Sequence, residues 1–347
     1  MEKQRRPIFQ PNELSESAVV SMRTRIIAAI VGIIIVIPFI IFGDWPFLGL
    51  IVAVLVLAII EIIRCAKTKY SKVLYIVSFL LAFLVLLWPV IQDITKMDSS
   101  WRIFDGYDHL SMSITIMFVG ICLSATTIFI DKNFTIIDAC FIFTAIVIIS
   151  LGLESFLYLR FYPVRLYHDA LKAAGQSVSY INIYDNLESF LLIFYVALGA
   201  CLNDAFAYFV GIFLGKHKMN ERISPKKTWE GFFGGVILAS IFLSGFALLL
   251  AFVDGGKHAL LPGILDKEHM YHIFILSTVI PLLSTVGDLV FSAIKRHYQI
   301  KDFSNLIPGH GGILDRLDSL LFAGITAAIY ISIFANLTQP SGGSILP

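Results

Sequence analysis

The segment 284–318 holds the densest group of ionisable side chains in a chain that is otherwise mostly apolar. Asp288 falls inside an apolar run, where an ionised carboxylate is costly unless it has a cation partner. Asp315 and Asp318 are spaced so that a helix would carry both carboxylates on one face. Like charges at this distance need a metal ion or a basic group between them, and oxygen ligands suit Mg²⁺. We therefore predict that the three aspartates bind magnesium and are catalytic.

These acidic residues also have a purely structural interpretation. Asp315 could cap the helix that follows a glycine-rich turn, and Asp318 could pair with Arg316 or Lys301. We favour the metal site because an aspartate at membrane depth, as we expect for Asp288, is rare unless it has a functional role.

Basic side chains of the same segment are candidates for binding a phosphate. Lys295 and Arg296 lie one to two helical turns after Asp288, and we expect Lys295 to be catalytic and Arg296 to bind substrate. The alternative is that both only extend to the membrane interface at the end of a span. Lys301 and Arg316 are further candidates for substrate binding.

A glycine-rich turn, residues 308–312, separates the two halves of this segment. Gly311 and Gly312 can let the backbone approach a phosphate closely, or they can simply make the turn. His310 is the most obvious general base, although a histidine in a turn is as often structural. We predict that His310, Gly311 and Gly312 bind substrate, without an acid–base role for the histidine.

A second basic segment, 215–229, precedes another apolar run. Lys226 and Lys227 could clamp a triphosphate, and the hydroxyl groups of Ser224 and Thr228 are of the kind that phosphates bind. The competing interpretation is a basic cytoplasmic loop without a ligand, because such loops are enriched in Lys and Arg. We predict that these four side chains bind substrate.

Three sequence blocks have fixed spacing between polar residues and glycines. They are Ser292-Ala-Ile-Lys295-Arg296 with Lys301-Asp302 and Pro308-Gly-His-Gly-Gly-Ile-Leu-Asp315-Arg-Leu-Asp318; Ser224-Pro-Lys-Lys-Thr-x-Glu-Gly; and Asn203-Asp204-x-x-Ala207-Tyr208-x-x-Gly211. These blocks resemble the phosphatidate cytidylyltransferase (CDP-diacylglycerol synthase) family. Asp204, a carboxylate inside an apolar run, is a further candidate for substrate binding. Residues 1–190 are similar to the family mainly in hydropathy.

The resemblance implies a reaction between two anions. The family joins phosphatidate to the α-phosphorus of CTP and releases pyrophosphate, which gives CDP-diacylglycerol for phospholipid biosynthesis. A lipid phosphate with a second pKa of about 6 is largely ionised near neutral pH, so a general base is not obligatory. Catalysis should come from metal ions and Lys or Arg contacts that neutralise the repulsion.

The resemblance also carries expectations about cofactors, assembly and location. It implies Mg²⁺, together with a second, monovalent cation such as K⁺. It suggests a homodimer. It places the protein in the bacterial inner membrane, with the active site facing the cytoplasm.

The composition is that of a polytopic membrane protein. Of the 347 residues, 57% are hydrophobic and 15% are charged, and the mean hydropathy is +0.83. The net charge of +1 and the basic residues at the ends of apolar runs give no reason to expect a nucleic-acid partner. Four cysteines without paired spacing argue against a disulfide framework or a zinc site.

Apolar runs predict an all-α fold, a transmembrane helical bundle of about nine spans. The spans fall near 25–42, 46–63, 73–91, 111–130, 135–157, 188–214, 230–253, 271–294 and 319–337. Alternate connections carry most of the 26 Lys and Arg residues, which places the amino terminus and both motif loops in the cytoplasm. We expect a polar cytoplasmic tail (1–22), an amino-terminal region of five spans (23–187), a carboxyl-terminal catalytic region of four spans (188–338) and a disordered tail (339–347).

Two other functions fit parts of this pattern. A CTP-dependent polyprenol or lipid kinase would share the metal and the phosphate clamp, but it would attack the γ-phosphorus with a lipid hydroxyl and would need a base. An ion-coupled transporter would line its path with Asp204 and Asp288, yet the charge is concentrated at one membrane face and no pair of interrupted helices repeats in two halves. The full pattern from Ser292 to Asp318 favours cytidylyl transfer.

Overall fold

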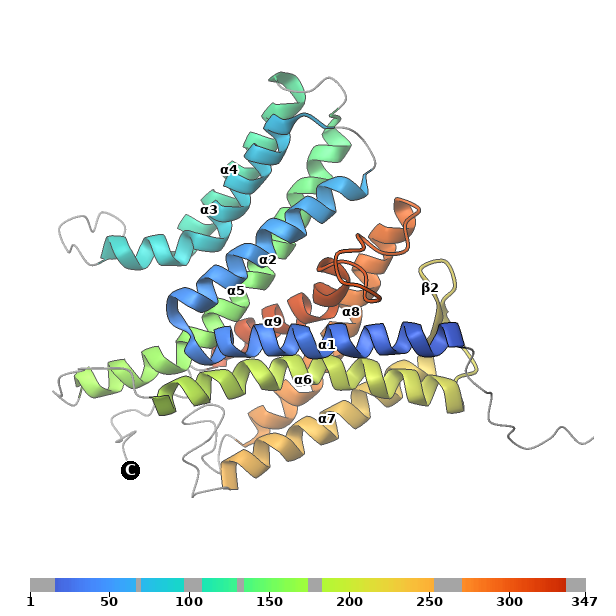
Figure 1. Ribbon diagram of the computed structural model, residues 1–347. Coiled ribbons are helices and arrows are strands. Elements are labelled where there is room, and N and C mark those ends of the chain that lie inside the picture. The colour runs from blue at the N-terminus through green and yellow to red at the C-terminus, as the bar shows by residue number, and fades with distance from the viewer. Residues whose placement is uncertain are drawn as a thin grey trace, which may run out of the picture.

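The computed structural model describes residues 16–66, 70–96, 108–129, 134–173, 183–252 and 270–334, and this part of the chain forms nine α-helices and one β-hairpin (Figure 1). The helices are α1 (Glu16–Phe42), α2 (Asp44–Cys65), α3 (Lys72–Lys96), α4 (Asp108–Phe129), α5 (Ile136–Ala173), α6 (Ile183–Leu214), α7 (Trp229–Phe252), α8 (Tyr271–His297) and α9 (Leu314–Phe334). The strands are β1 (Lys218–Asn220) and β2 (Ser224–Thr228). Each predicted span falls on one helix, so the prediction of a helical bundle is confirmed. The predicted tail 339–347 and most of the tail 1–22 lie outside the described residues.

Length and apolar composition make six of the described helices, α2 and α5 to α9, able to cross a membrane. In α1, α3 and α4 the apolar stretches within the described residues are shorter, 10–17 residues each. The protein is therefore an integral membrane protein. About nine spans, a cytoplasmic amino terminus and the division into two membrane regions stay predictions.

The basic segment 215–229 departs from the all-α expectation, because it folds into an antiparallel hairpin. Lys218 pairs with Thr228 and Asn220 pairs with Ser224. The side-chain oxygen of Asn220 accepts hydrogen bonds from the backbone N–H groups of Arg222 and Ile223, at 3.1 and 3.2 Å, which closes the turn. The helices also continue beyond the predicted spans, since α5 and α6 extend into the connection expected at 158–187.

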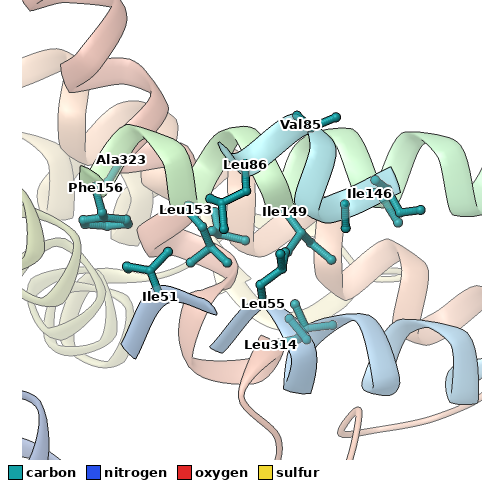
Figure 2. Packing of buried hydrophobic residues seen from close by; sticks show 14 of the residues in the cluster. Ile51, Leu55, Val85, Leu86, Ile146, Ile149, Leu153, Phe156, Leu314 and Ala323 are labelled. Carbon is teal, nitrogen blue, oxygen red and sulfur yellow. The ribbon is translucent and has the colours of Figure 1, made fainter. Parts of the chain in front are cut away.

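The apolar core forms where α5 packs against α2, α3 and α9 (Figure 2). Leu55 of α2, Leu86 of α3, Ile146 and Ile149 of α5, and Leu314 of α9 are all fully buried. Because lipid is as apolar as these side chains, tight packing holds such helices together. The first two turns of α9, which carry the predicted acidic pair, are thereby fixed against the amino-terminal helices.

The helices α8 and α9 approach each other closely at Gly287. A Cβ atom on this residue would clash with the backbone oxygen of Asp318, so a larger residue would force the two helices apart. Glycine at 287 therefore brings the next residue, Asp288, beside the acidic first turns of α9. The loop from α8 to α9 lies at the same end of the bundle as the hairpin (Figure 1).

Candidate active site

Lys295, in the last turn of α8, is at the centre of a buried ionic cluster. Its ammonium nitrogen lies 2.8 Å from Oδ1 of Asp315 and 3.7 Å from Oδ2 of Asp318. The side chains of Lys295, Asp315 and Asp318 are only 10%, 3% and 12% exposed. The ammonium also lies 5.5 Å from the ring centroid of Phe303, within range of a cation–π contact. Lys295 is thus the basic group that the two neighbouring aspartates need, in place of Arg316 or Lys301.

Asp315 also caps the amino terminus of α9. Its Oδ2 accepts hydrogen bonds from the backbone N–H groups of Phe303 (2.8 Å) and Gly312 (2.9 Å). These bonds satisfy backbone donors that would otherwise be buried without partners. Both oxygens of Asp315 are therefore occupied, one by Lys295 and the other by the loop before α9.

Asp288 forms a second and more open ion pair. Its Oδ2 lies 2.5 Å from the ammonium of Lys227 on the hairpin, and its Oδ1 accepts a hydrogen bond of 3.1 Å from the hydroxyl of Ser292. The side chains of Asp288 and Lys227 are 24% and 26% exposed. The structure thus brings together the acidic residue of α8 and one lysine of the basic segment, which are far apart in the sequence.

Asp204 on α6 adds a further carboxylate to this region. Its side chain interacts electrostatically with Asp288 and Lys227, and Asp318 interacts with both Asp288 and Asp204. Carboxylates from α6, α8 and α9 therefore share one region, where their mutual repulsion favours a cation. The side chain of Asp204 is exposed on α6.

The position of α6 against α8 is set by the residue before Asp204. Asn203 is buried, and its amide nitrogen donates hydrogen bonds to the hydroxyl groups of Ser284 (3.3 Å) and Thr285 (2.8 Å). These bonds connect the two helices one turn before Asp288. The polar residue in the apolar run thus holds the helix that carries Asp204 in register with α8.

The hairpin is fixed at its base by polar contacts with the start of α7. Glu230 accepts hydrogen bonds from the backbone N–H groups of Lys216 and His217, and its carboxylate contacts Nδ1 of His217 at 2.5 Å. The hydroxyl of Thr228, predicted to bind phosphate, accepts a hydrogen bond of 3.1 Å from the N–H of Gly231 and so caps α7. The base of the hairpin is therefore held against the start of α7 by hydrogen bonds.

The remaining predicted residues of the hairpin differ in exposure. Lys227 is partly buried against Asp288, whereas Lys226 on the same strand is exposed and Ser224 is partly buried. Arg296, predicted to bind substrate, donates a hydrogen bond of 3.2 Å from Nε to the carbonyl of Ile223. Arg296 thus attaches the hairpin to α8, which keeps Lys227 opposite the acidic residue.

The glycine-rich turn is held by contacts within the loop. Gly311 has φ +87°, which favours glycine, and a Cβ there would lie 2.9 Å from Oδ2 of Asp315. The guanidinium of Arg316 donates hydrogen bonds of 3.1 and 2.8 Å to the carbonyl of His310. Lys301 is exposed. The glycine and Arg316 therefore shape the turn that presents His310.

Glu61 on α2 was not predicted from the sequence as part of this site. It is 4% exposed and accepts hydrogen bonds from the hydroxyl of Ser304 (2.6 Å) and the N–H groups of Ile313 (2.9 Å) and Leu314 (2.8 Å). A signal was present, because Glu61 is an acidic residue inside the apolar run 46–63, as Asp288 is in its own run. The site is thus connected to the amino-terminal half of the chain.

Comparisons with known proteins identify the family to which this chain belongs. The model described as the cytidylyltransferase family matches residues 23–334. The chain belongs to this family. The phosphatidate cytidylyltransferase of Bacillus subtilis is 31% identical over 305 residues, which cover 87% of this chain and 95% of the relative. The phosphatidate cytidylyltransferases of Staphylococcus saprophyticus and Staphylococcus epidermidis are 30% and 28% identical over 302 residues, with the same coverage.

Two predictions are confirmed by these matches. They are the resemblance to the phosphatidate cytidylyltransferase family and the class of enzyme, a nucleotidyltransferase. The matched region includes every described helix that contributes to the site, from Glu61 on α2 to Asp318 on α9. The family therefore extends over both halves of the bundle.

For this cytidylyltransferase, the described residues show ion pairs where the sequence predicts metal ligands. Among them, no group of three or more His, Cys, Asp or Glu side chains is arranged to hold a metal ion. Asp288 pairs with Lys227 and Asp315 pairs with Lys295. Magnesium and a monovalent cation stay predictions, as do the individual roles assigned to the site residues.

Proposed function

We propose that this cytidylyltransferase transfers CMP from CTP to phosphatidate, which gives CDP-diacylglycerol and pyrophosphate. The observation that carries the proposal is the Lys227–Asp288 pair beside Asp204 and Asp318. It combines a basic group suited to a phosphate with carboxylates suited to a cation, which a reaction between two anions requires. The names of the relatives support phosphatidate as the acceptor.

The reaction is a displacement at the α-phosphorus of CTP. A phosphate oxygen of phosphatidate forms the new bond as the bond from the α-phosphorus to the bridging oxygen breaks, and pyrophosphate leaves with the electron pair. The attacking oxygen is already ionised near neutral pH, so His310 is not needed as a base. Lys227, which is partly exposed, neutralises the phosphates of CTP, and the buried Lys295 holds Asp315 and Asp318 in place.

Magnesium fits the donor chemistry of the acidic residues. Asp288 and Asp318 would hold it, because their side chains are 24% and 12% exposed, whereas that of Asp315 is 3% exposed and held by Lys295 and two backbone N–H groups. Carboxylate oxygens are the ligands this ion prefers in proteins. When bound, the ion would neutralise charge on the triphosphate and on the leaving pyrophosphate.

We also propose that the site faces the cytoplasm from the bacterial inner membrane, in a homodimer. The basic hairpin and the α8–α9 loop lie at one end of the bundle, and the inside-positive bias favours the cytoplasm for that end (Figure 1). CTP would enter there, while the apolar helices give phosphatidate access from the bilayer.

The test uses the purified protein in mixed micelles with Mg²⁺, CTP and phosphatidate. Release of pyrophosphate together with labelled CDP-diacylglycerol is expected, and Asp288→Asn should abolish both while the protein stays folded. Chelation of the metal should stop the reaction, and added Mg²⁺ should restore it. Formation of CDP with a polyprenol or diacylglycerol acceptor, without pyrophosphate, would instead identify a kinase and refute the proposal.

A further inference from the structure

Glu61 connects the amino-terminal half of the chain to the loop that precedes α9. We infer that Glu61 is a positioning residue for the active site, which fixes the loop 303–313 and thereby the acidic first turns of α9. The effect on catalysis rests on the proposed function, whereas the anchoring of the loop does not. Glu61 would act without contact with either substrate.

The contacts of Glu61 and Asp315 are complementary. Glu61 binds the hydroxyl of Ser304 and the N–H groups of Ile313 and Leu314. Asp315 binds the N–H groups of the residues just before these, Phe303 and Gly312. Two carboxylates from different helices therefore hold the two ends of one loop together. Loss of the first would leave the second as the main support of the loop.

The residue at 312 shows how closely the two segments approach. A Cβ atom on Gly312 would lie 2.6–2.8 Å from the carboxylate of Glu61, closer than real Cβ atoms come to other atoms. The φ angle of Gly312 is not in the left-handed region, unlike that of Gly311. A larger residue at 312 would therefore have to displace the carboxylate of Glu61 from its present position and hydrogen bonds.

Buried hydrogen-bond donors surround the carboxylate of Glu61. The side chain is 4% exposed and receives three hydrogen bonds, two of them from N–H groups at the amino terminus of α9. A negative charge at a helix amino terminus is stabilised by the helix dipole. An uncharged side chain would leave at least one buried donor without an acceptor.

Glu61→Ala and Glu61→Gln test the inference in the full-length protein. Hydrogen exchange of the segment 303–316 should speed up in both variants, more strongly in the alanine variant, because glutamine keeps one acceptor oxygen. The kcat for pyrophosphate release should fall about 100-fold in the alanine variant and about 10-fold in the glutamine variant, because small displacements of catalytic groups lower the rate by such factors. The KM for CTP should change less than about threefold, because Lys227 lies on another element.

Arg160→Ala is the matched control. Arg160 is also a charged side chain in the core, 1% exposed, but it donates hydrogen bonds to the carbonyls of Ile40 and Ile41 in the last turn of α1. That end of α1 lies across the bundle from the hairpin (Figure 1). Arg160→Ala should lower stability while kcat per folded molecule and exchange of 303–316 stay as in the wild type.

A double-mutant cycle with Gly312→Ala gives an independent result. Gly312→Ala should lower the melting temperature and kcat in the wild type but have a smaller effect when Glu61 is already alanine, because the added methyl group then has room. Additive effects would contradict the close approach of the two residues.

Three outcomes would overturn the inference. In the first, Glu61→Ala has the same kcat as the wild type. In the second, its kcat falls but hydrogen exchange of the segment 303–316 is unchanged. In the third, hydrogen exchange becomes faster in all helices, as it would after a general loss of stability. Absence of pyrophosphate release from the wild-type protein would refute the proposed function instead. The exchange data and the melting temperatures of the cycle would then still decide whether Glu61 anchors the loop.

Discussion

Replacing Lys295 with methionine should show how strongly the buried ionic cluster depends on one charge. Methionine keeps the unbranched side chain but leaves Asp315, which is 3% exposed and 2.8 Å from the lysine, without its cation. Removing one partner of a buried ion pair typically costs about 3–5 kcal/mol. At about 1–2 °C per kcal/mol for a chain of 347 residues, the melting temperature should fall by roughly 3–10 °C. The longer contact with Asp318, at 3.7 Å, adds less.

The assay is thermal unfolding of the purified protein in detergent, and a second substitution tests the reason for the loss. Asp315→Asn removes the uncompensated charge but keeps an oxygen for the N–H groups of Phe303 and Gly312. The double variant Lys295→Met with Asp315→Asn should therefore melt above Lys295→Met alone. Lys301→Met, which changes an exposed lysine of the same loop, is the control and should shift melting by less than about 2 °C.

Two results would refute this reasoning. A melting temperature of Lys295→Met within about 2 °C of the wild type would mean that the cluster is not a closed ionic network. An Asp315→Asn substitution that lowers the melting temperature by the same amount with and without Lys295 would mean that the two side chains do not interact.

The hairpin and the turn give three further predictions. In steady-state kinetics, Lys227→Ala should lower kcat/KM for CTP by at least about tenfold, whereas Lys226→Ala should lower it less than about threefold. The reason is that Lys227 pairs with Asp288 in the site and Lys226 is exposed; equal effects of the two substitutions would contradict this. Glu230→Ala should speed proteolytic cleavage between β1 and β2, since two backbone N–H groups lose their acceptor, and an unchanged cleavage rate would argue against its role. Gly311→Ala should lower the melting temperature by roughly 1–4 °C, because a left-handed φ costs alanine about 1–2 kcal/mol; an unchanged melting temperature would contradict this.

The helices were predictable because they follow from local composition. Every predicted span lies on a helix, because an apolar segment in a membrane satisfies its backbone hydrogen bonds internally by forming one. The hairpin was not predicted, because its strands have only three and five residues and their register is set by Asn220 and Glu230 and not by periodicity. Short strands of this kind have no sequence pattern that separates them from a basic loop.

The sequence was sufficient to predict which acidic and basic residues belong to the site, but not which of them pair with each other. Spacing within one helix brought Asp315 and Asp318 to one face, yet nothing in that spacing selects Lys295 over Lys301 as their cation. The contact of Glu61 with Leu314 joins residues 253 positions apart, so it depends on how α2 packs against α9. Such contacts follow from tertiary packing, which single-helix patterns do not contain.

The two lysine–aspartate pairs differ in how exposed their side chains are, and under the proposed function this difference gives them different roles. Lys295 and Asp315 are 10% and 3% exposed, so a ligand could displace either only by opening the protein. Lys227 and Asp288 are 26% and 24% exposed, and a triphosphate entering between them would give the lysine a new anion while freeing the carboxylate for a cation. The pair on the hairpin can thus exchange partners during turnover, while the buried pair keeps α8 and α9 aligned around it.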